Sequence, residues 1–116
     1  MVVEDHPLVR MAVLEVMIEA GFEALDASSA SGAIGILEAR PDIHLVFTDA
    51  EMPGTMDGIG LAHYIRNRWP PVKLIVVSGM KEIASEELPE GARFFHKPYC
   101  ETSIVEAMID MVSGAP

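Results

Sequence analysis

The sequence predicts an α/β fold built on a parallel β-sheet. Apolar runs of strand length alternate with stretches of helical periodicity, and this alternation continues to the C-terminal end of the chain. The run from Lys73 to Val77 offers apolar residues to both faces, as a central strand of a parallel sheet requires. The chain has 116 residues, which is the length of one domain with one core, so we expect a single domain over residues 1–116.

The first 40 residues predict two strands, each followed by a helix. Proline favours the first turn of a helix and glycine the residue after its last turn, so Pro7 and Gly21 bound the first helix. One face of this helix carries apolar residues at helical spacing, namely Val9, Val13, Val16, Met17 and Ala20. The elements expected here are a short strand at 2–3, a helix at 7–20, a weak strand at 22–26, and a helix that runs from a cap at Ser28 or Ser29 to Arg40.

The remaining chain predicts three more strands but only two helices of ordinary length. Trp69-Pro70-Pro71 closes the first of these helices, because the residue before a proline disfavours helical backbone. The stretch from Met80 to Pro89 is short, acidic and broken by Pro89 and Gly91, so we expect at most two turns of helix there. The other elements are strands at 43–48, 73–77 and 92–95, and helices at 58–69 and 102–112.

Polar residues follow the apolar runs, at the positions where an open parallel sheet binds ligands beyond the carboxyl ends of its strands. They are Glu4-Asp5 after the first strand, Asp49 after the third, Ser78 after the fourth and Lys97 after the fifth. Three carboxylates at one edge repel each other and lose hydration, which destabilises the fold unless cations offset the charge. Lys97 and a divalent cation would do so, and hard oxygen ligands suit Mg²⁺ better than zinc. Asp49, facing both cations, is then a competent phosphoryl acceptor.

Four motifs in register resemble the receiver domain of bacterial two-component response regulators, and the resemblance covers essentially the whole chain. The motifs are VVEDHP, FTDAEMPG followed by MDG, VVSG and FFHKPY. The resemblance implies a flavodoxin-like, doubly wound (βα)5 fold, with a five-stranded parallel sheet in the strand order 2-1-3-4-5. The interval from Ser78 to Lys97 is shorter than the family usually shows, so we expect a shortened fourth helix.

By the same resemblance, Asp49 is the phosphoacceptor and also a ligand of Mg²⁺. Asp5 would be a direct metal ligand, and Glu4 would assist metal binding indirectly. Glu51, two residues after Asp49, would offer its backbone carbonyl to the metal. The turn Met52-Pro53-Gly54 would direct this carbonyl toward the site.

Ser78, Lys97 and Phe94 take the remaining roles that the resemblance implies. The hydroxyl of Ser78 would bond a phosphoryl oxygen, and Lys97 would pair with the phosphoryl group. Ser78 and Phe94 would form the switch that responds to phosphorylation, although a half-buried strand aromatic such as Phe94 needs no function. The bond between Lys97 and Pro98 is expected to be cis, which is otherwise rare for an X-Pro bond.

These roles imply a phosphorylation-controlled signalling switch. A sensor histidine kinase or a phosphotransfer protein would phosphorylate Asp49 in a Mg²⁺-dependent reaction, and the domain would signal through contacts with an unknown downstream protein. A homodimer is left open, and the chain would not be an enzyme beyond catalysing its own phosphorylation and dephosphorylation. Two alternatives remain. One is a small Mg²⁺-dependent phosphatase with Asp49 as covalent nucleophile and Glu51 as acid/base, and the other is a non-phosphorylated pseudo-receiver that only docks to proteins.

The composition argues against nucleic-acid and membrane partners. The formal net charge is -10 and the pI is about 4.6, whereas nucleic-acid affinity comes from Lys and Arg that displace counterions. No apolar run approaches the roughly 20 residues that span a bilayer, and the N-terminus lacks the basic-then-apolar order of a signal peptide. We therefore expect a cytoplasmic protein. The final residues, 113–116, have the composition of a linker start.

Structural roles are expected for the remaining reactive side chains. The single cysteine, Cys100, cannot form an internal disulfide and is expected to be a small, partly buried residue. The histidines are isolated from one another in the sequence, so surface or packing roles are expected for His6, His44, His63 and His96. The methionines at 11, 17, 108 and 111 are expected to fill the core.

Overall fold

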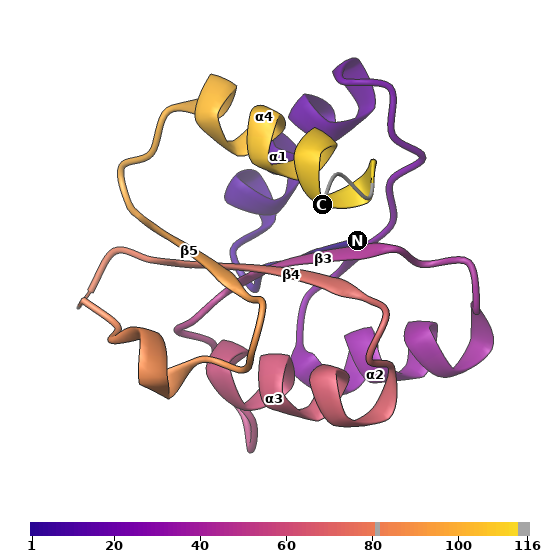
Figure 1. The fold of residues 1–116 in the computed structure, drawn as a ribbon, viewed down its shortest axis with the longest axis vertical. Coiled ribbons are helices and arrows are strands. Elements are labelled where there is room, and N and C mark those ends of the chain that lie inside the picture. Colours follow the sequence, from indigo (N-terminus) through magenta and orange to yellow (C-terminus); the bar gives the residue numbers. More distant parts are fainter. Residues whose placement is uncertain (81, 114–116) are drawn as a thin grey trace.

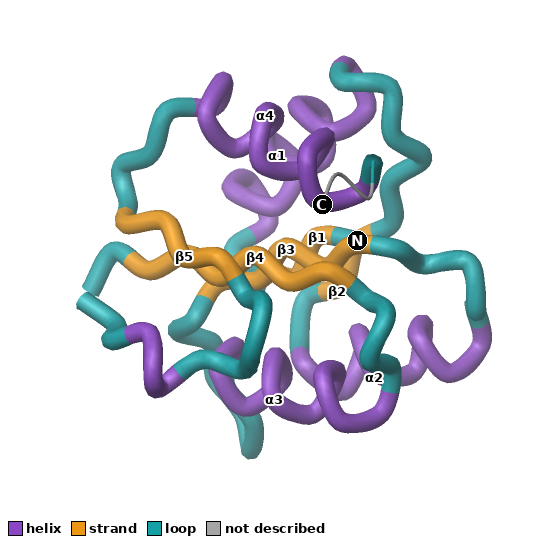
Figure 2. The backbone as a smooth tube through the Cα atoms, in the orientation of Figure 1, coloured by secondary structure: helices purple, strands orange, loops and turns teal. Residues whose placement is uncertain are grey.

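In the computed structural model, which describes residues 1–80 and 82–113, five parallel strands form one sheet in the order β2-β1-β3-β4-β5. The strands are β1 (Val2–Val3), β2 (Asp26–Ala27), β3 (Leu45–Asp49), β4 (Lys73–Ser78) and β5 (Arg93–His96). The sheet crosses the middle of the molecule (Figure 2). This strand order confirms the order 2-1-3-4-5 that the family resemblance implies.

Four α-helices of the described residues cover the two faces of the sheet. They are α1 (Pro7–Glu19), α2 (Ala30–Ala39), α3 (Gly58–Arg68) and α4 (Glu101–Val112). Helices α1 and α4 lie on one face, and α2 and α3 lie on the other (Figure 1). The fold is therefore the flavodoxin-like, doubly wound arrangement predicted above.

Two apolar cores flank the sheet, because neighbouring residues of a strand point to opposite faces. Phe47, Ile75 and Val77 belong to the core shared with α1 and α4. Val46 and Val76 alternate with them and belong to the core shared with α2 and α3. All residues of β3 are buried, which explains why the central strands read as continuous apolar runs in the sequence.

Only part of the apolar stripe predicted for α1 lies in the core. Val13 and Met17 are buried, but Val9 is exposed. The expectation that Met11 fills the core is wrong, because this side chain is 56% exposed. Residues two positions apart on a helix face in different directions, so Met11 cannot share the orientation of Val13. Met108 is fully buried, in agreement with the prediction.

The second strand is shorter than the predicted 22–26 and lies nearer to α2. It spans two residues because β1, its only neighbour in the sheet, itself offers two residues for pairing. The helix that follows is capped by Ser29, whose Oγ accepts the backbone N–H of Gly32 at 3.1 Å. This bond decides between the two serines that the sequence offered as caps.

The β4–β5 connection, residues 79–92, contains a single 3₁₀ turn, η1 (Ser85–Glu87), among its described residues. The predicted shortening of the fourth helix is thus confirmed, and the turn is even shorter than the two helical turns allowed for it. Pro89 and Gly91 follow directly, and Gly91 has a φ of 82°, which glycine adopts without strain. Strand β5 begins and ends one residue later than expected.

Helix α3 holds the β4–β5 connection in place through side chains that bond backbone groups. Arg66 donates to the carbonyl of Glu90 at 2.9 Å and also to two carbonyls of the chain that leads into β4. The ring of His63 bonds the carbonyl of Glu87 at 2.8 Å, so this histidine has the structural role expected for it. Ile83 and Leu88 anchor the connection in the core beside α3. The conformation of the connection therefore depends on α3 more than on its own short turn.

We expect Arg66→Ala to loosen the β4–β5 connection and to lower the free energy of unfolding by about 2 kcal/mol, because a charged donor to several carbonyls is removed. Hydrogen exchange followed by mass spectrometry would show faster exchange in residues 82–92 than in the wild type. Arg68→Ala is the control. Arg68 is exposed, and its 3.6 Å ion pair with Glu38 and its cation–π contact with Trp69 do not involve residues 82–92. Unchanged exchange of residues 82–92 in Arg66→Ala would contradict this account.

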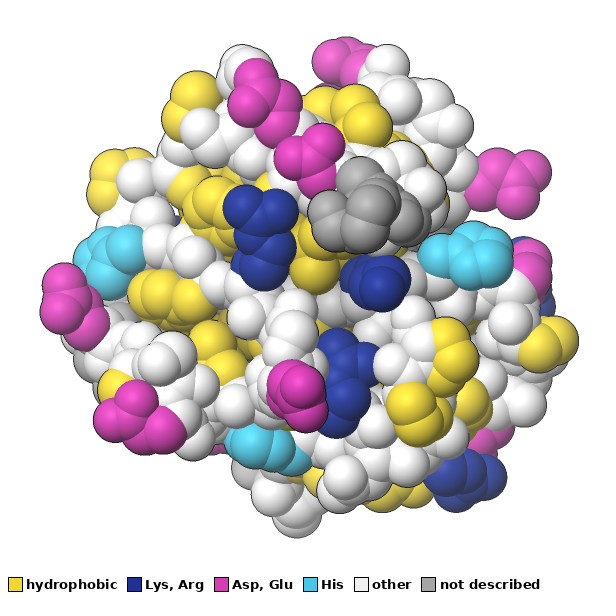
Figure 3. Space-filling model, in the orientation of Figure 1, with side chains coloured by type: hydrophobic (Ala, Val, Ile, Leu, Met, Phe, Trp, Pro, Cys, Tyr) yellow, Lys and Arg dark blue, Asp and Glu magenta, His cyan; other side chains and the backbone are white. Residues whose placement is uncertain are grey.

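The surface carries charges of both signs. On the face shown in Figure 3, Lys, Arg, His, Asp and Glu side chains are intermingled. Cys100 is exposed, so the expectation of a partly buried thiol is wrong; it lies in the loop that leads into α4 rather than in an element of the core. Among the described residues, no helix has the length and apolar character needed to cross a membrane. The expected linker start falls largely on residues 114–116, which lie outside the described part of the chain.

Candidate functional site

Five of the residues predicted for the site meet at the carboxyl edge of the sheet, namely Glu4, Asp49, Glu51, Ser78 and Lys97. Asp49 is the last residue of β3, Ser78 is the last residue of β4, and Glu4 directly follows β1. The strand register aligns them, because Val77 pairs with Asp49 and Ser78 pairs with His96, the residue before Lys97. Glu4, Asp49 and Ser78 are all buried. Burial of two carboxylates side by side is costly, so their partners decide what the site can do.

Asp49 has a hydrogen-bond donor on each carboxylate oxygen. Lys97 Nζ lies 2.8 Å from Oδ2, and the backbone N–H of Glu51 donates to Oδ1 at 3.0 Å. Lys97 Nζ also lies 3.8 Å from Glu4 Oε2. The bond from Lys97 to Pro98 is cis, as predicted. One ammonium therefore pairs with both buried carboxylates.

The charge at this edge is only partly compensated, and Glu4 shows this most clearly. Burial raises the pKa of Glu4 from its ordinary value of 4.5 to about 7, and the neighbouring Asp49 adds to the rise. The N–H of His6 and the charge of Lys97 act in the opposite direction. Burial alone would lower the pKa of Lys97, but the hydrogen bond from Lys97 to Asp49 and the nearby carboxylates raise it overall. The site thus favours an additional positive charge.

The residues present fit a Mg²⁺ ion by the chemistry of their donors. Glu4 and Asp49 supply hard carboxylate oxygens, and the backbone carbonyl of Glu51 belongs to the turn next to Asp49. Mg²⁺ keeps several of its waters and needs few protein ligands. Asp5 is exposed, and the described residues contain no cluster of three or more acidic, His or Cys side chains at metal-binding spacing. The direct ligand role of Asp5 therefore stays a prediction.

The hydroxyl of Ser78 has a hydrogen-bond partner in the structure that was not predicted from the sequence. Its Oγ donates to the Glu51 carboxylate, with 2.8 Å to each of the two carboxylate oxygens. The family resemblance assigned a metal-binding role to the backbone carbonyl of Glu51, and its side chain had a role only as the acid/base group of the phosphatase alternative. Phe94 lies half-buried in β5 and packs against the core on the side of α2 and α3. Its switch role stays a prediction.

Gly58 is a further site residue whose role the sequence did not reveal, although it lies in the MDG motif. A Cβ at this position would lie 1.7 Å from the backbone oxygen of Asp49, which no side chain tolerates. Gly58 is the first residue of α3, and Asp57 caps this helix by accepting the N–H of Gly60 at 2.8 Å. The absence of a side chain at Gly58 lets α3 begin directly against the phosphoacceptor candidate.

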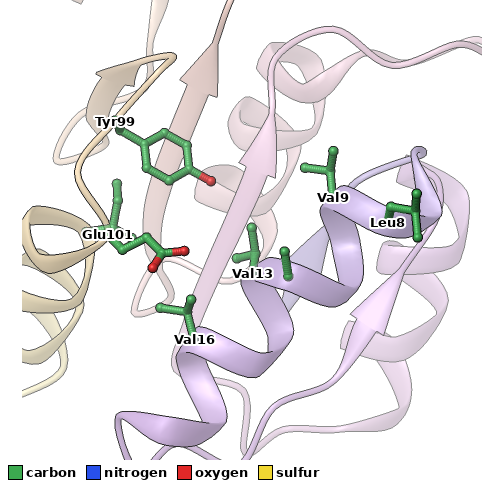
Figure 4. Close-up of a pocket in the computed structure, with 8 residues that line it drawn as sticks. Leu8, Val9, Val13, Val16, Tyr99 and Glu101 are labelled. Carbon is green, nitrogen blue, oxygen red and sulfur yellow. The ribbon is translucent and has the colours of Figure 1, made fainter.

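A hollow of about 260 Å³ lies between α1 and the start of α4. Figure 4 shows Val9, Val13 and Val16 of α1 across from Tyr99 and Glu101. The ring of Tyr99 also packs edge-on against Phe47 of β3 at 6.0 Å between centroids. The hollow is almost wholly apolar, so it is a surface feature separate from the charged residues at the strand ends.

Comparison with known proteins shows the family to which the chain belongs. The chain matches the family model of the response regulator receiver domain over residues 1–109, and it belongs to this family. Among curated relatives, it is 34% identical to the response regulator protein FleR of Pseudomonas aeruginosa and 31% identical to the sensor kinase CckA of Brucella abortus. Both matches cover 97% of this chain, but the chain spans only 23% and 12% of the length of these relatives.

Solved structures show the same fold. The signal receiver domain of the response regulator NarL from Mycobacterium tuberculosis superposes with a TM-score of 0.81 at 30% identity, covering 97% of this chain and 94% of that one. A receiver domain protein from Clostridium thermocellum gives a TM-score of 0.88 at 23% identity, covering 97% and 91%. At 23% identity, the likeness to the Clostridium thermocellum protein supports the fold alone.

We expect Gly58→Ala to lower the free energy of unfolding by about 3 kcal/mol, because the new methyl group overlaps the backbone of Asp49. Gly35→Ala in α2 is the matched control. A Cβ there meets nothing within 4 Å, and alanine in a helix interior should stabilise by up to about 1 kcal/mol. Urea denaturation measures whether the free energy of unfolding falls in Gly58→Ala and rises in Gly35→Ala. Similar stabilities for the two variants would refute the close approach of Gly58 to the backbone of Asp49.

We expect Glu4→Gln to stabilise the metal-free protein at pH 8 and to have a smaller effect at pH 5. The pKa of Glu4 in the folded protein is about 7, above its ordinary 4.5, so the stability that Glu4 contributes falls as the pH rises through this window. Glutamine keeps the shape and an acceptor for the N–H of His6 but carries no charge.

Thermal unfolding with a chelator at pH 5 and pH 8 measures the difference between variant and wild type. Glu38→Gln serves as control for the substitution itself, since Glu38 is about half exposed on α2. A Glu4→Gln effect that is equal at both pH values would contradict the electrostatic account.

Proposed function

We propose that this domain is a phosphorylation-controlled switch in which Asp49 accepts a phosphoryl group. The observation that carries the proposal is the buried Asp49 carboxylate, held 2.8 Å from the ammonium of Lys97 at the carboxyl edge of the sheet. A cation beside the acceptor offsets charge that builds on the phosphoryl oxygens during transfer. Membership of the receiver family supports this use of the site.

Phosphoryl transfer to Asp49 forms one bond at phosphorus and breaks another. An oxygen of Asp49 attacks the phosphorus of a phosphohistidine, the new P–O bond forms, and the P–N bond breaks with its electron pair going to the histidine nitrogen. Lys97 stays beside the acceptor oxygen and pairs with the phosphoryl group. Asp49, Asp5 and the carbonyl of Glu51 would hold Mg²⁺, with Glu4 assisting indirectly, and the ion would supply positive charge against the phosphoryl oxygens.

A sensor histidine kinase or a phosphotransfer protein is the proposed donor. Relatives include a protein named as a response regulator and one named as a sensor kinase, of which this chain spans a small part. Phosphorylation would act on Ser78 and Phe94, and the altered surface would bind a downstream protein or a second copy of the chain. Apart from its own phosphorylation and dephosphorylation, the domain would catalyse nothing, and it would work in the cytoplasm.

The two alternatives have less support. A phosphatase would need Glu51 as its acid/base group, but this carboxylate accepts the Ser78 hydroxyl at 2.8 Å. A docking-only pseudo-receiver would not need Asp49, Lys97 and Ser78 together at one buried edge. Phosphorylation of Asp49 therefore accounts for more of the observed arrangement than either alternative.

Intact mass spectrometry after incubation with acetyl phosphate tests the proposal. In this reaction the P–O bond to acetate breaks and acetate leaves, so a mass gain of one phosphoryl group is expected only with Mg²⁺. Asp49→Asn is expected to gain no mass, because the amide oxygen is a poor nucleophile. If the folded wild type gains no mass, the docking-only pseudo-receiver is the better hypothesis. Turnover of a generic phosphoester would favour the phosphatase hypothesis.

A further inference from the structure

We propose that the Glu51 carboxylate holds the Ser78 hydroxyl in the unphosphorylated protein and must release it before Ser78 can bind a phosphoryl oxygen. Glu51 is then a positioning residue that opposes phosphorylation and sets the resting state of the switch. The inference rests on the function proposed above, and it concerns only side chains of this chain.

The competition follows from the chemistry of a single hydroxyl proton. Ser78 Oγ donates to Glu51, with Oε1 and Oε2 both at 2.8 Å. A carboxylate accepts hydrogen bonds and cannot donate them, and the same holds for an ionised phosphoryl oxygen. The hydroxyl has one proton, so it cannot donate fully to both acceptors. Binding of a phosphoryl oxygen by Ser78 therefore requires loss of the bond to Glu51.

Ser78 cannot escape this competition by moving its backbone. It is fully buried at the end of β4, where it pairs with His96 of β5, and its carbonyl accepts the N–H of Lys97 at 2.8 Å. Only rotation of the Ser78 side chain is left as a local adjustment. Rotation of the Ser78 side chain toward Asp49 and displacement of Glu51 both break the Glu51–Ser78 bond, so either route must overcome it.

Glu51 is placed to sense the phosphorylation of Asp49. Its backbone N–H donates to Asp49 Oδ1 at 3.0 Å, while its side chain accepts from Ser78. The same residue thus contacts the acceptor and the hydroxyl that would report on it. A phosphoryl group on Asp49 brings negative charge next to the Glu51 carboxylate, and the two like charges repel each other.

Space is available for the displaced side chain. Glu51 is half-buried and lines a hollow of about 430 Å³ together with Met52, Pro53, Asp57 and others of the turn after β3. The side chain can leave Ser78 by rotating toward this hollow and solvent, without a change in the sheet. Phosphorylation would exchange a Glu51–Ser78 bond for a phosphoryl–Ser78 bond.

Binding of beryllofluoride, a stable mimic of the phosphoryl group, tests the competition. Calorimetric titration with Mg²⁺ present would compare the wild type, Glu51→Ala and Glu51→Gln. We expect Glu51→Ala to bind about tenfold more tightly, as loss of a competing hydrogen bond to a charged group implies. Glu51→Gln should gain less, because it loses the charge but keeps an oxygen that accepts from Ser78.

A second background separates hydrogen-bond competition from simple charge repulsion. In Ser78→Ala the competition is absent, so Glu51→Ala should there change the affinity by less than threefold, reflecting repulsion alone. An equal gain from Glu51→Ala in both backgrounds, or no gain in either, would overturn the proposal. If Ser78→Ala does not fold, equal affinities of Glu51→Gln and Glu51→Ala would overturn it in the same way.

A metal-free measurement shows whether the bond itself exists. Urea unfolding with a chelator is measured for the wild type, Glu51→Ala, Ser78→Ala and the double variant. The unfolding equilibrium constant of the double variant should differ by at least fivefold from the value expected if the two single effects were independent. Additive effects would remove the basis of the proposal. Absence of beryllofluoride binding in every variant, with the coupling present, would instead show that the proposed phosphoacceptor function fails and that the switch role of Glu51 fails with it.

Discussion

The ion pair between Asp49 and Lys97 is the interaction on which the carboxyl edge of the sheet depends. It joins the end of the central strand β3 to the chain just beyond the edge strand β5, across the intervening β4. An unpaired carboxylate as deeply buried as Asp49 would strongly destabilise the fold. The same ammonium lies 3.8 Å from Glu4, so three strand ends share one positive charge. The position of Lys97 therefore sets both the stability of this edge and the charge that a ligand meets there.

Much of the fold could be predicted because the central strands are recognisable from their own apolar residues. β3 and β4 are buried on both faces and read as apolar runs, and Ser29 and Gly21 mark helix ends by local chemistry. The strand order came only from the family resemblance, since nothing local encodes which strands are neighbours. The extent of β2 was misjudged because it depends on the two residues that β1 offers for pairing. Exposure of Met11 likewise depends on how α1 is rotated against the sheet.

Most residues of the candidate site could be predicted from the sequence, but the hydrogen bonds between their side chains could not. The ends of parallel strands meet at one edge, so Glu4, Asp49 and Ser78 were expected to approach one another. The bond from Ser78 to Glu51 was not, because it depends on the direction in which a side chain leaves an irregular turn. The requirement for glycine at position 58 could not be predicted either, since the contact that requires glycine comes from the backbone of Asp49, nine positions earlier in the chain.

The short β4–β5 connection also has an electrostatic consequence. In a doubly wound fold, the helix after each strand begins near the carboxyl edge of the sheet, and its aligned peptide dipoles place partial positive charge there. The three-residue turn η1 is too short to build such a macrodipole after β4. The potential around Glu4 and Asp49 is therefore more negative than a full helix would leave it, which favours the Mg²⁺ binding proposed for this edge.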